Sequence, residues 1–416
     1  MKSSSIIFFL LLAVQNVVAQ QQSVLGDNIR TLQVTVDNDP LQPVVMRLGG
    51  RQHVCIDFDE LSHDYHRYQY HVEHCTADWN ASSQLFESDY LSGFNDQPIE
   101  DYENSFNTNQ IYTHYRLQLP NEQTSMLLSG NYRVLIYDSD APDDTVAVAE
   151  FCVLEPLMSI SATVSSNTDI DFNGKHQQVS YSLSYGMATV LDPMREIYMV
   201  VMQNRRMDNA IRGLQPNIRK SSGAEWTYQR ELIFPAGSEY HKFELVNVHR
   251  PGMNVDNIRW YDPWYHVTLF ADTPTRNYSY DEDQNGVCVI RGDEEDDGMT
   301  TGEYLLVHFI LQCSEPLPGG DVYVNGLWSG NFPNPMMKME WNDTLRQYEC
   351  VAMLKQGYYS YQYLQADESG HGHQCNIDGD WYQTENEYII LAYYREQGAR
   401  YDRLTAYSKF NSNVSD

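Results

Sequence analysis

Alternation of apolar and polar residues recurs in short segments along almost the whole chain, and no other feature restricts its fold as strongly. Early segments of this kind are 32–36, 54–58, 68–74, 111–119, 131–137 and 147–154. Successive side chains of a β-strand point to opposite faces of a sheet, so the pattern predicts half-buried strands. The 31 tyrosines agree with this prediction, because tyrosine favours sheets. We therefore expect an all-β protein built of tandem immunoglobulin-like β-sandwich domains.

Two breaks divide the predicted strands into three sets. Glu155-Pro156 closes the first set, and the acidic stretch 293–298 interrupts the pattern a second time. A chain of 416 residues has room for two to four domains, each with a core of its own. We expect an N-terminal β-sandwich domain over 20–155, a middle one over 156–298 and a C-terminal one over 299–416.

The first 19 residues have the order of a secretory signal peptide. Lys2 supplies a positive charge, residues 6–14 are apolar, and small residues end the segment at Ala19. We expect cleavage after Ala19. The apolar run is too short to span a bilayer, and no later segment approaches the required length of about 18 residues. The sequence therefore predicts an exported, soluble protein that does not insert into the membrane.

The chain is strongly acidic, with a formal net charge of −30. Nucleic-acid binding needs a basic surface, and an anionic membrane surface would repel such a chain. Neither is therefore an expected partner. Two interpretations of the acidity stay open, namely solubility in a crowded compartment and attraction to a basic partner surface.

Seven cysteines follow the signal peptide, so at least one has no partner within the chain. Strand parity places Cys55 and Cys75 too far apart along neighbouring strands for a disulfide. Cys313 and Cys350 are in phase with apolar strand residues, which predicts that both lie in the core. The sequence leaves open whether a disulfide joins Cys313 and Cys350. The chain is not a disulfide scaffold.

Catalytic, cofactor and metal motifs are not found, and we expect no enzyme activity, no cofactor and no metal site. The stretch 371–375 offers two histidines and Cys375, but a glycine-flanked loop of this kind is more often incidental. The stretch 281–286 resembles half of a calcium loop, yet an Asx-rich turn accounts for it better. His74 and Cys75 are adjacent, so on a strand they face opposite sides and do not form a nucleophile pair.

A series of motifs in fixed order gives the chain a resemblance to one bacterial family. The motifs are Phe58-Asp59-Glu60-Leu61, Tyr68-Gln69-Tyr70, His74-Cys75-Thr76-Ala77-Asp78-Trp79, Tyr90-Leu91-Ser92-Gly93-Phe94, residues 101–108, Tyr112-Thr113-His114-Tyr115, Leu119-Pro120-Asn121, Ser129-Gly130-Asn131-Tyr132, Gln203-Asn204 with Arg206, Asp283-Gln284-Asn285-Gly286, Tyr393-Tyr394-Arg395 and Arg400-Tyr401-Asp402. The whole of the chain after the signal peptide resembles the type IX secretion system plug protein family of Bacteroidetes.

The resemblance implies a non-enzymatic protein of the periplasm. Such a protein would bind the outer-membrane translocon barrel of the type IX secretion system and occlude its periplasmic opening. The barrel is thus the expected partner, no contact residue is identified, and a monomer is the expected oligomeric state. Six of the cysteines are not motif residues of this family.

A second likeness concerns the C-terminal domain. Residues 321–328, Trp341 and residues 357–363 resemble an early-set immunoglobulin-like fold of the glycogen-binding-module type. In such modules aromatic rings stack on sugars, which Trp328 and Trp341 could do. An alternative function is therefore a carbohydrate-binding accessory protein of the cell envelope. The competing interpretation is that both tryptophans pack in the core or an interface.

Overall fold

The alternation of strand β24 (Tyr304–Gln312) illustrates how the sequence forms its sheets. Leu305, Val307, Phe309 and Leu311 are buried, and the residues between them are half-exposed. The computed structural model describes residues 23–24, 26–64, 66–292, 298–367, 372–375 and 377–412. Within these ranges, strands predominate, and the helical elements are single turns. The prediction of an all-β protein is confirmed, whereas the predicted signal peptide over 1–19 lies outside the described residues.

The helical turns are few and short. They are α1 (Glu87–Tyr90), α2 (Pro193–Glu196) and the 3₁₀ turns η1 (Arg230–Leu232), η2 (Leu327–Ser329) and η3 (Pro335–Met337). Within the part of the chain that is described, no helix has the length and apolar character needed to cross a membrane.

The first unit comprises residues 23–154 and contains two facing sheets and a small two-stranded one. Its strands are β1 (Ser23–Val24), β2 (Ile29–Val36), β3 (Val45–Arg47), β4 (Val54–Glu60), β5 (Tyr68–Cys75), β6 (Leu91–Gly93), β7 (Gln97–Pro98), β8 (Asp101–Asn104), β9 (Thr113–Leu119), β10 (Thr124–Met126), β11 (Gly130–Asp138) and β12 (Thr145–Leu154). One sheet has the order β1-β12-β11-β5-β7, with β3 parallel to β12, and the other has the order β2-β4-β9-β8. Their inner faces form one core from Ile29 to Val153.

The second unit combines residues 159–235 with the C-terminal segment 387–411. Its strands are β13 (Ser159–Ser165), β14 (His176–Ser184), β15 (Ile197–Gln203), β16 (Ile211–Arg212), β17 (Ile218–Lys220), β18 (Gly223–Trp226), β19 (Ile233–Pro235), β30 (Glu387–Tyr394) and β31 (Arg403–Asn411). The sheet β13-β14-β18-β17, with β19 beside β14, faces the sheet β16-β15-β30-β31.

The third unit comprises residues 241–374. Its strands are β20 (His241–Leu245), β21 (Val255–Tyr261), β22 (Trp264–Leu269), β23 (Cys288–Ile290), β24, β25 (Asp321–Asn325), β26 (Glu340–Asn342), β27 (Gln347–Lys355), β28 (Gly357–Ala366) and β29 (Gly372–Gln374). The sheet β21-β22-β24-β27-β26 packs on a sheet centred on β28, which pairs with β20, β23, β25 and β29.

The predicted boundary at residue 298 does not match this strand pairing and is corrected. Strands β22 and β23 precede it, yet they pair with β24 and β28 beyond it. Strand β30 pairs in turn with β15 of the second unit. The third unit is therefore inserted between two parts of the second. Local alternation predicts that a segment is a strand, but its pairing partner depends on backbone contacts between segments far apart in the chain.

Strand β30 explains why the C-terminal segment returns to the second unit. Every one of its residues is buried. Tyr388 and Ile390 point into the core of the second unit, whereas Ile389 and Leu391 point into a further cluster shared with the first unit. A strand that is apolar on both faces needs cover on both sides, which its central place provides.

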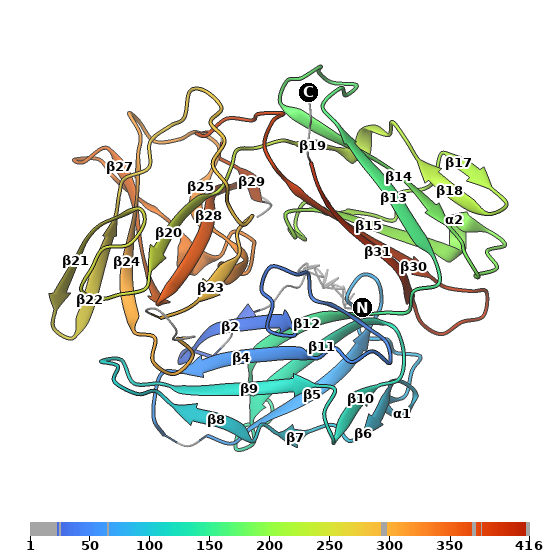
Figure 1. Ribbon diagram of the computed structural model, residues 1–416, viewed down its shortest axis with the longest axis horizontal. Helices are drawn as coiled ribbons and strands as arrows, with labels where there is room; N and C mark the ends of the chain where they lie inside the picture. The colour runs from blue at the N-terminus through green and yellow to red at the C-terminus, as the bar shows by residue number, and fades with distance from the viewer. Residues whose placement is uncertain are drawn as a thin grey trace, which may run out of the picture.

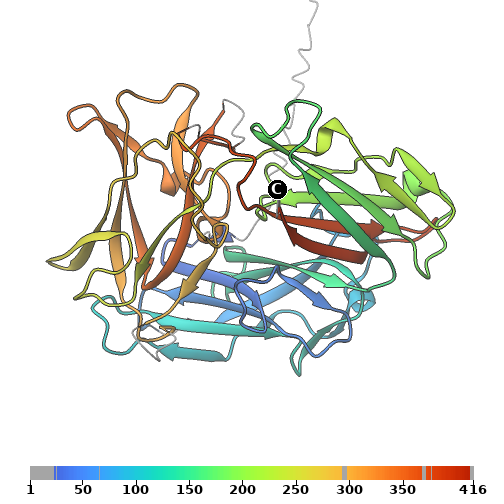
Figure 2. The same ribbon diagram turned by 45° about the horizontal axis from the view of Figure 1, so that its top comes forward.

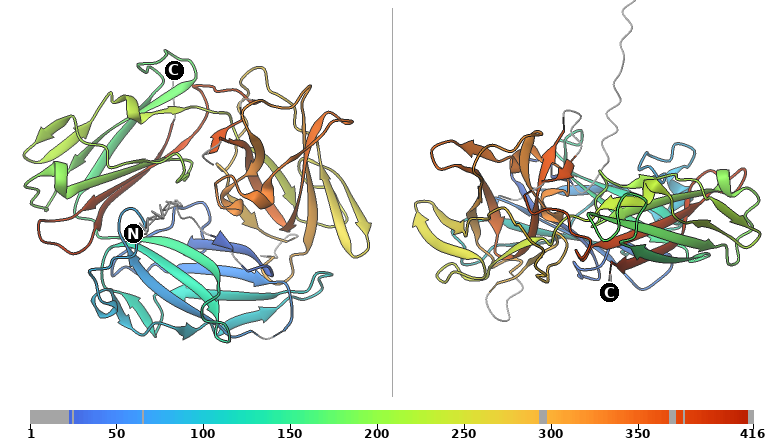
Figure 3. Two further views of the ribbon diagram at one scale, coloured as in Figure 1. Left: turned by 180° about the vertical axis from the view of Figure 1, so that it is seen from behind. Right: turned by 90° about the horizontal axis from the view of Figure 1, so that it is seen from above.

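The three units lie around a common centre (Figures 1 and 2). Figure 1 shows the first unit (blue to teal) below, the second (green, with the red β30 and β31) at upper right and the third (yellow to orange) at upper left. Seen from behind the same three lobes appear, and seen from above the body is flatter than it is wide (Figure 3).

Candidate functional site

Trp328 lies in η2 and faces inward. Its indole Nε1 donates a hydrogen bond to the carbonyl oxygen of Ser360 at 3.0 Å. Its ring is stacked on Phe309 with centroids 6.1 Å apart and meets Tyr359 edge-on at 5.4 Å. A ring held between two aromatic side chains offers little free face for a sugar.

Trp341 lies on the edge strand β26 and is also packed against the third unit. Its ring meets Tyr348 at a centroid distance of 5.0 Å, and the guanidinium of Arg346 lies 6.0 Å from its centroid. Both tryptophans pack against the same hydrophobic core. These contacts are those of packing residues, one of the two interpretations drawn from the sequence.

The seven cysteines are all free thiols. Cys313 and Cys350 belong to the core of the third unit, as predicted, but they do not pair because Phe309 stands opposite Cys350 in the sheet. Burial raises the pKa of the Cys350 thiol to about 11 and that of the Cys75 thiol to about 12. Thiols of this kind are unreactive.

The remaining chemical motifs have structural roles. His74 is buried, and its ring nitrogens lie 2.8 Å from Ser82 Oγ and 3.1 Å from the carbonyl oxygen of Ser129. In the stretch 281–286, the Asp283 carboxylate accepts hydrogen bonds from the backbone N–H groups of Tyr240 and Asn285, as an Asx-rich turn requires. Across the described ranges, no group of three metal-ligating side chains is found, and His371 lies outside them.

A buried ionic cluster joins the first unit to the third. Asp59 Oδ2 accepts hydrogen bonds from Lys355 Nζ and from Tyr304 Oη, both at 2.6 Å. Asp59 Oδ1 lies 2.7 Å from His114 Nδ1. Burial alone would raise the pKa of Asp59, but Lys355 and His114 hold it below its usual value. The ammonium group of Lys355 also lies 4.1 Å from the centre of the Tyr112 ring.

A second contact reinforces this interface. The buried Glu303 carboxylate of the third unit accepts hydrogen bonds from the backbone N–H groups of Asn109 and Gln110, at 2.6 and 3.0 Å. The hydroxyl of Tyr112 donates to the carbonyl oxygen of Gly302 at 2.9 Å. Buried polar groups that are satisfied only across an interface fix the relative position of the two units.

The second unit is fastened to the first by similar bonds. Tyr393 Oη donates to Asn131 Oδ1 at 2.7 Å, and Asp402 accepts from the backbone N–H of Ala77 at 2.9 Å. Arg205 is bound to Glu387 at 2.8 Å and also donates to the carbonyl oxygen of Leu41. The residues in these contacts come from the first unit and from both parts of the second.

Contacts between the second and third units complete the ring. Arg206 is buried, is paired with Asp208 at 2.7 Å and donates to the carbonyl oxygen of Gly372. Asn331 Nδ2 donates to the carbonyl oxygen of Asn204 at 3.0 Å. Several motif residues from the sequence, among them Asp59, Ala77, Asn204, Arg206, Tyr393 and Asp402, are thus the residues that hold the units together.

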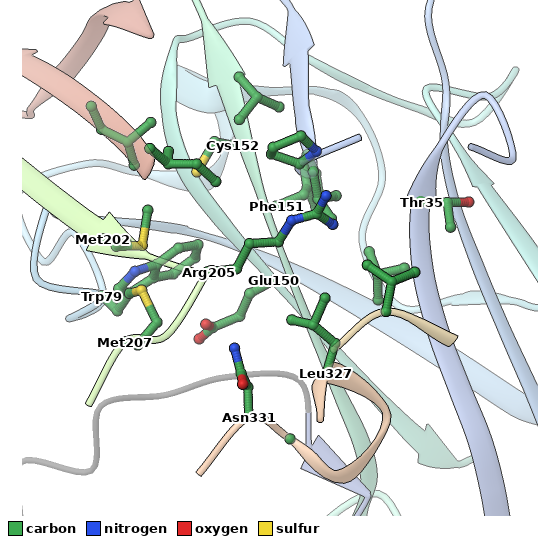
Figure 4. A pocket seen from close by; sticks show the side chains of 18 of the residues that line it. Thr35, Trp79, Glu150, Phe151, Cys152, Met202, Arg205, Met207, Leu327 and Asn331 are labelled. Carbon is green, nitrogen blue, oxygen red and sulfur yellow. The ribbon is translucent and has the colours of Figure 1, made fainter. Parts of the chain in front are cut away.

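A cavity of about 190 Å³ lies where the three units meet. The first unit contributes Trp79, Glu150 and Cys152, the second Met202, Arg205 and Met207, and the third Leu327 and Asn331 (Figure 4). Burial raises the pKa of Glu150 to about 7. The sequence did not predict this cavity, because the residues of its walls belong to three different units.

Comparisons with known proteins agree with this architecture. Residues 29–155 match the family model of the type 9 secretion system plug protein, first domain. A crystal structure of a hypothetical protein from Parabacteroides merdae ATCC 43184 is 42% identical in sequence, with a TM-score of 0.91. The alignment covers 94% of this chain and 99% of that one. The search of curated proteins finds no match.

The fold and the junction define an all-β protein of three joined units, and several of the motif residues that carry the resemblance lie at the junction. The chain belongs to the type 9 secretion system plug protein family.

Proposed function

We propose that this protein is a non-enzymatic periplasmic plug that binds the outer-membrane translocon barrel of the type IX secretion system and occludes its periplasmic opening. The family assignment supports this role. The single structural observation behind it is the closed ring of three units, joined by buried contacts such as Asp59 with Lys355. A body that blocks a wide pore must resist deformation, and buried bonds between all three units supply that resistance.

The proposed location follows from the same reasoning. A plug acts from the periplasm, and the N-terminal 19 residues supply the expected export signal. Partner and location are part of the proposal, as is a single copy of the plug per opening.

The carbohydrate-binding alternative finds less support. Its candidate platforms, Trp328 and Trp341, are engaged with Phe309, Tyr359 and Tyr348. We therefore favour the plug over the accessory protein.

The test is affinity purification of a tagged copy from native envelopes in mild detergent, followed by mass spectrometry and electron microscopy. We expect recovery of a large outer-membrane barrel with this protein at its periplasmic mouth. Recovery with surface glycan-uptake components and without such a barrel would contradict the plug.

The contact face can be mapped with one exposed phenylalanine from each unit. Phe94 in the first unit is 74% exposed, Phe172 in the second 72% and Phe270 in the third 58%. Each is changed to Ser, and the amount of barrel recovered is compared. Exposed aromatic side chains are frequent anchors at interfaces, so we expect at least one variant to lose the barrel while the others serve as matched controls.

A further inference from the structure

A second cavity of about 330 Å³ adjoins the cavity at the junction. The two share the lining residues Leu32, Gln33, Cys288, Leu327, Trp328 and Gly330. The second cavity reaches strand β27 at Val351 and Met353 and the 3₁₀ turn η3 at Met336. The two cavities are therefore neighbours, and we call the pair the junction channel.

The far end of the junction channel is strongly apolar. Strand β15 contributes Val200 and Met202, and strand β30 contributes Ile389 and Leu391. All four belong to the cluster that the second unit shares with the first. Water gains few hydrogen bonds along such walls, whereas a hydrocarbon chain is stabilised by about 0.8 kcal/mol for each CH₂ group it buries.

The charges along the channel oppose those of the whole protein. The chain has 57 acidic and 27 basic residues, yet the channel is lined by Arg30, Arg205 and Arg212 and, among acidic residues, by Glu150 alone. The channel is therefore a local basic site in an acidic protein, which favours an anionic ligand.

Arg212 is the cation best placed to receive that ligand. Arg205 is neutralised by Glu387 at 2.8 Å, and Glu150 is neutralised by Arg133 at 3.2 Å. Among the residues that the structure describes, no carboxylate lies within ion-pair distance of Arg212, although its charge acts on Glu150 and offsets part of the rise in pKa that burial causes in that carboxyl. The guanidinium of Arg212 contacts Met207 Sδ at 3.7 Å. Arg212 stands opposite Val200 in the sheet, beside the apolar end of the channel.

We propose that the junction channel binds a single-chain amphiphile with an anionic head group, of the fatty-acid class, with the hydrocarbon chain along Val200 and Leu391 and the head group at Arg212. A carboxylate would form charge-assisted hydrogen bonds with the guanidinium. This ligand would be held inside the body of the protein, so its binding is independent of the proposed role at the translocon.

The test uses the full-length protein and dodecanoate, with dodecyltrimethylammonium as the cationic counterpart of the same chain length. Binding is measured by native mass spectrometry and by calorimetry. We expect a 1:1 complex with dodecanoate and weaker binding of the cation. Arg212→Gln should weaken dodecanoate binding about tenfold to a hundredfold, the loss expected for a hydrogen bond between charged groups.

Two further variants complete the design. Arg219→Gln removes an exposed arginine of the same unit and should leave binding unchanged. Val200→Phe fills the channel and should abolish binding, provided that circular dichroism shows the native sheet content. If Val200→Phe does not fold, the test of the proposal is the comparison of dodecanoate affinity between Arg212→Gln and Arg219→Gln.

Three outcomes would overturn the proposal. They are the absence of a 1:1 complex with dodecanoate, equal affinity for the cationic amphiphile, and equal affinity of the Arg212→Gln and Arg219→Gln variants.

Discussion

Lys355 Nζ lies 2.6 Å from Asp59 Oδ2, and both side chains are 1% exposed. The two residues are far apart in sequence and belong to different units, so this pair is a direct bond between the first unit and the third. A buried charge without its partner is costly, which makes the pair a sensitive point of the interface.

Lys355→Met should therefore lower the free energy of unfolding by about 3–5 kcal/mol, because it leaves the buried Asp59 carboxylate without its ammonium partner. Urea titration measures this change. The matched control is Lys338→Met, which removes a solvent-exposed pair with Asp321 and should leave the urea midpoint almost unchanged. An equal loss of unfolding free energy in both variants would contradict the conclusion that the buried pair stabilises the interface.

Stability should fall as pH rises from about 6.5 to above 8. Burial alone would lower the pKa of His114, but the carboxylates of Asp57 and Asp59 raise it to about 8. A group with a raised pKa stabilises the fold fully below its ordinary pKa of about 6.5 and loses this effect as pH passes the folded value. The shift corresponds to about 2 kcal/mol.

The experiment for His114 compares the free energy of unfolding at several pH values for the wild type and for His114→Gln. The variant should show a flatter profile in this window, and His53→Gln, which changes an exposed histidine, should follow the wild type. Parallel profiles for all three proteins would show that His114 does not titrate as expected.

None of the seven thiols should form a bridge or react while the protein is folded. Six are buried and Cys288 is half-buried, and burial raises the pKa of the Cys288 thiol to about 12. Labelling with iodoacetamide near pH 8 should modify few cysteines in native protein and all seven after denaturation, as counted by mass spectrometry. An intact mass lower by two hydrogens would reveal a disulfide.

Trp328→Ala should destabilise the protein by about 3 kcal/mol or more, since it removes a large ring from between Phe309 and Tyr359. Thermal unfolding measures the loss, with Phe172→Ala as the exposed control. Soluble α-glucans should not quench tryptophan fluorescence of the wild type. Glucan binding that Trp328→Ala abolishes without unfolding would favour the carbohydrate alternative.

The inserted third unit predicts which fragment of the chain can fold. Residues 239–378 contain all strands that surround the third core, whereas 299–416 lack β20 to β23 and include β30 and β31 of another unit. The first fragment should therefore unfold cooperatively in urea. The second should show no such transition, and the reverse result would contradict the unit boundaries described above.

Sequence patterns predicted well what depends on neighbouring residues. The phase of Leu305, Val307 and Phe309 correctly indicated a strand with one buried face and a core position for Cys313. The motif stretch 281–286 was correctly interpreted as a turn, because the backbone N–H of Asn285 donates to the Asp283 carboxylate within the stretch itself. The second bond of that carboxylate, from the backbone N–H of Tyr240, joins residues far apart in the chain.

Tertiary structure alone decided how these pieces combine. The strand character of residues 387–394 follows from their composition, but their pairing with β15 depends on a contact across nearly half of the chain. The pairing of Lys355 with Asp59 likewise depends on a contact between distant parts of the chain. The junction channel does too, because its walls come from different units. Alternation is a local property, whereas pairing, burial of charge and cavities depend on which surfaces meet. The sequence by itself therefore determined the strands and their faces, and the packing of the three units determined the junction.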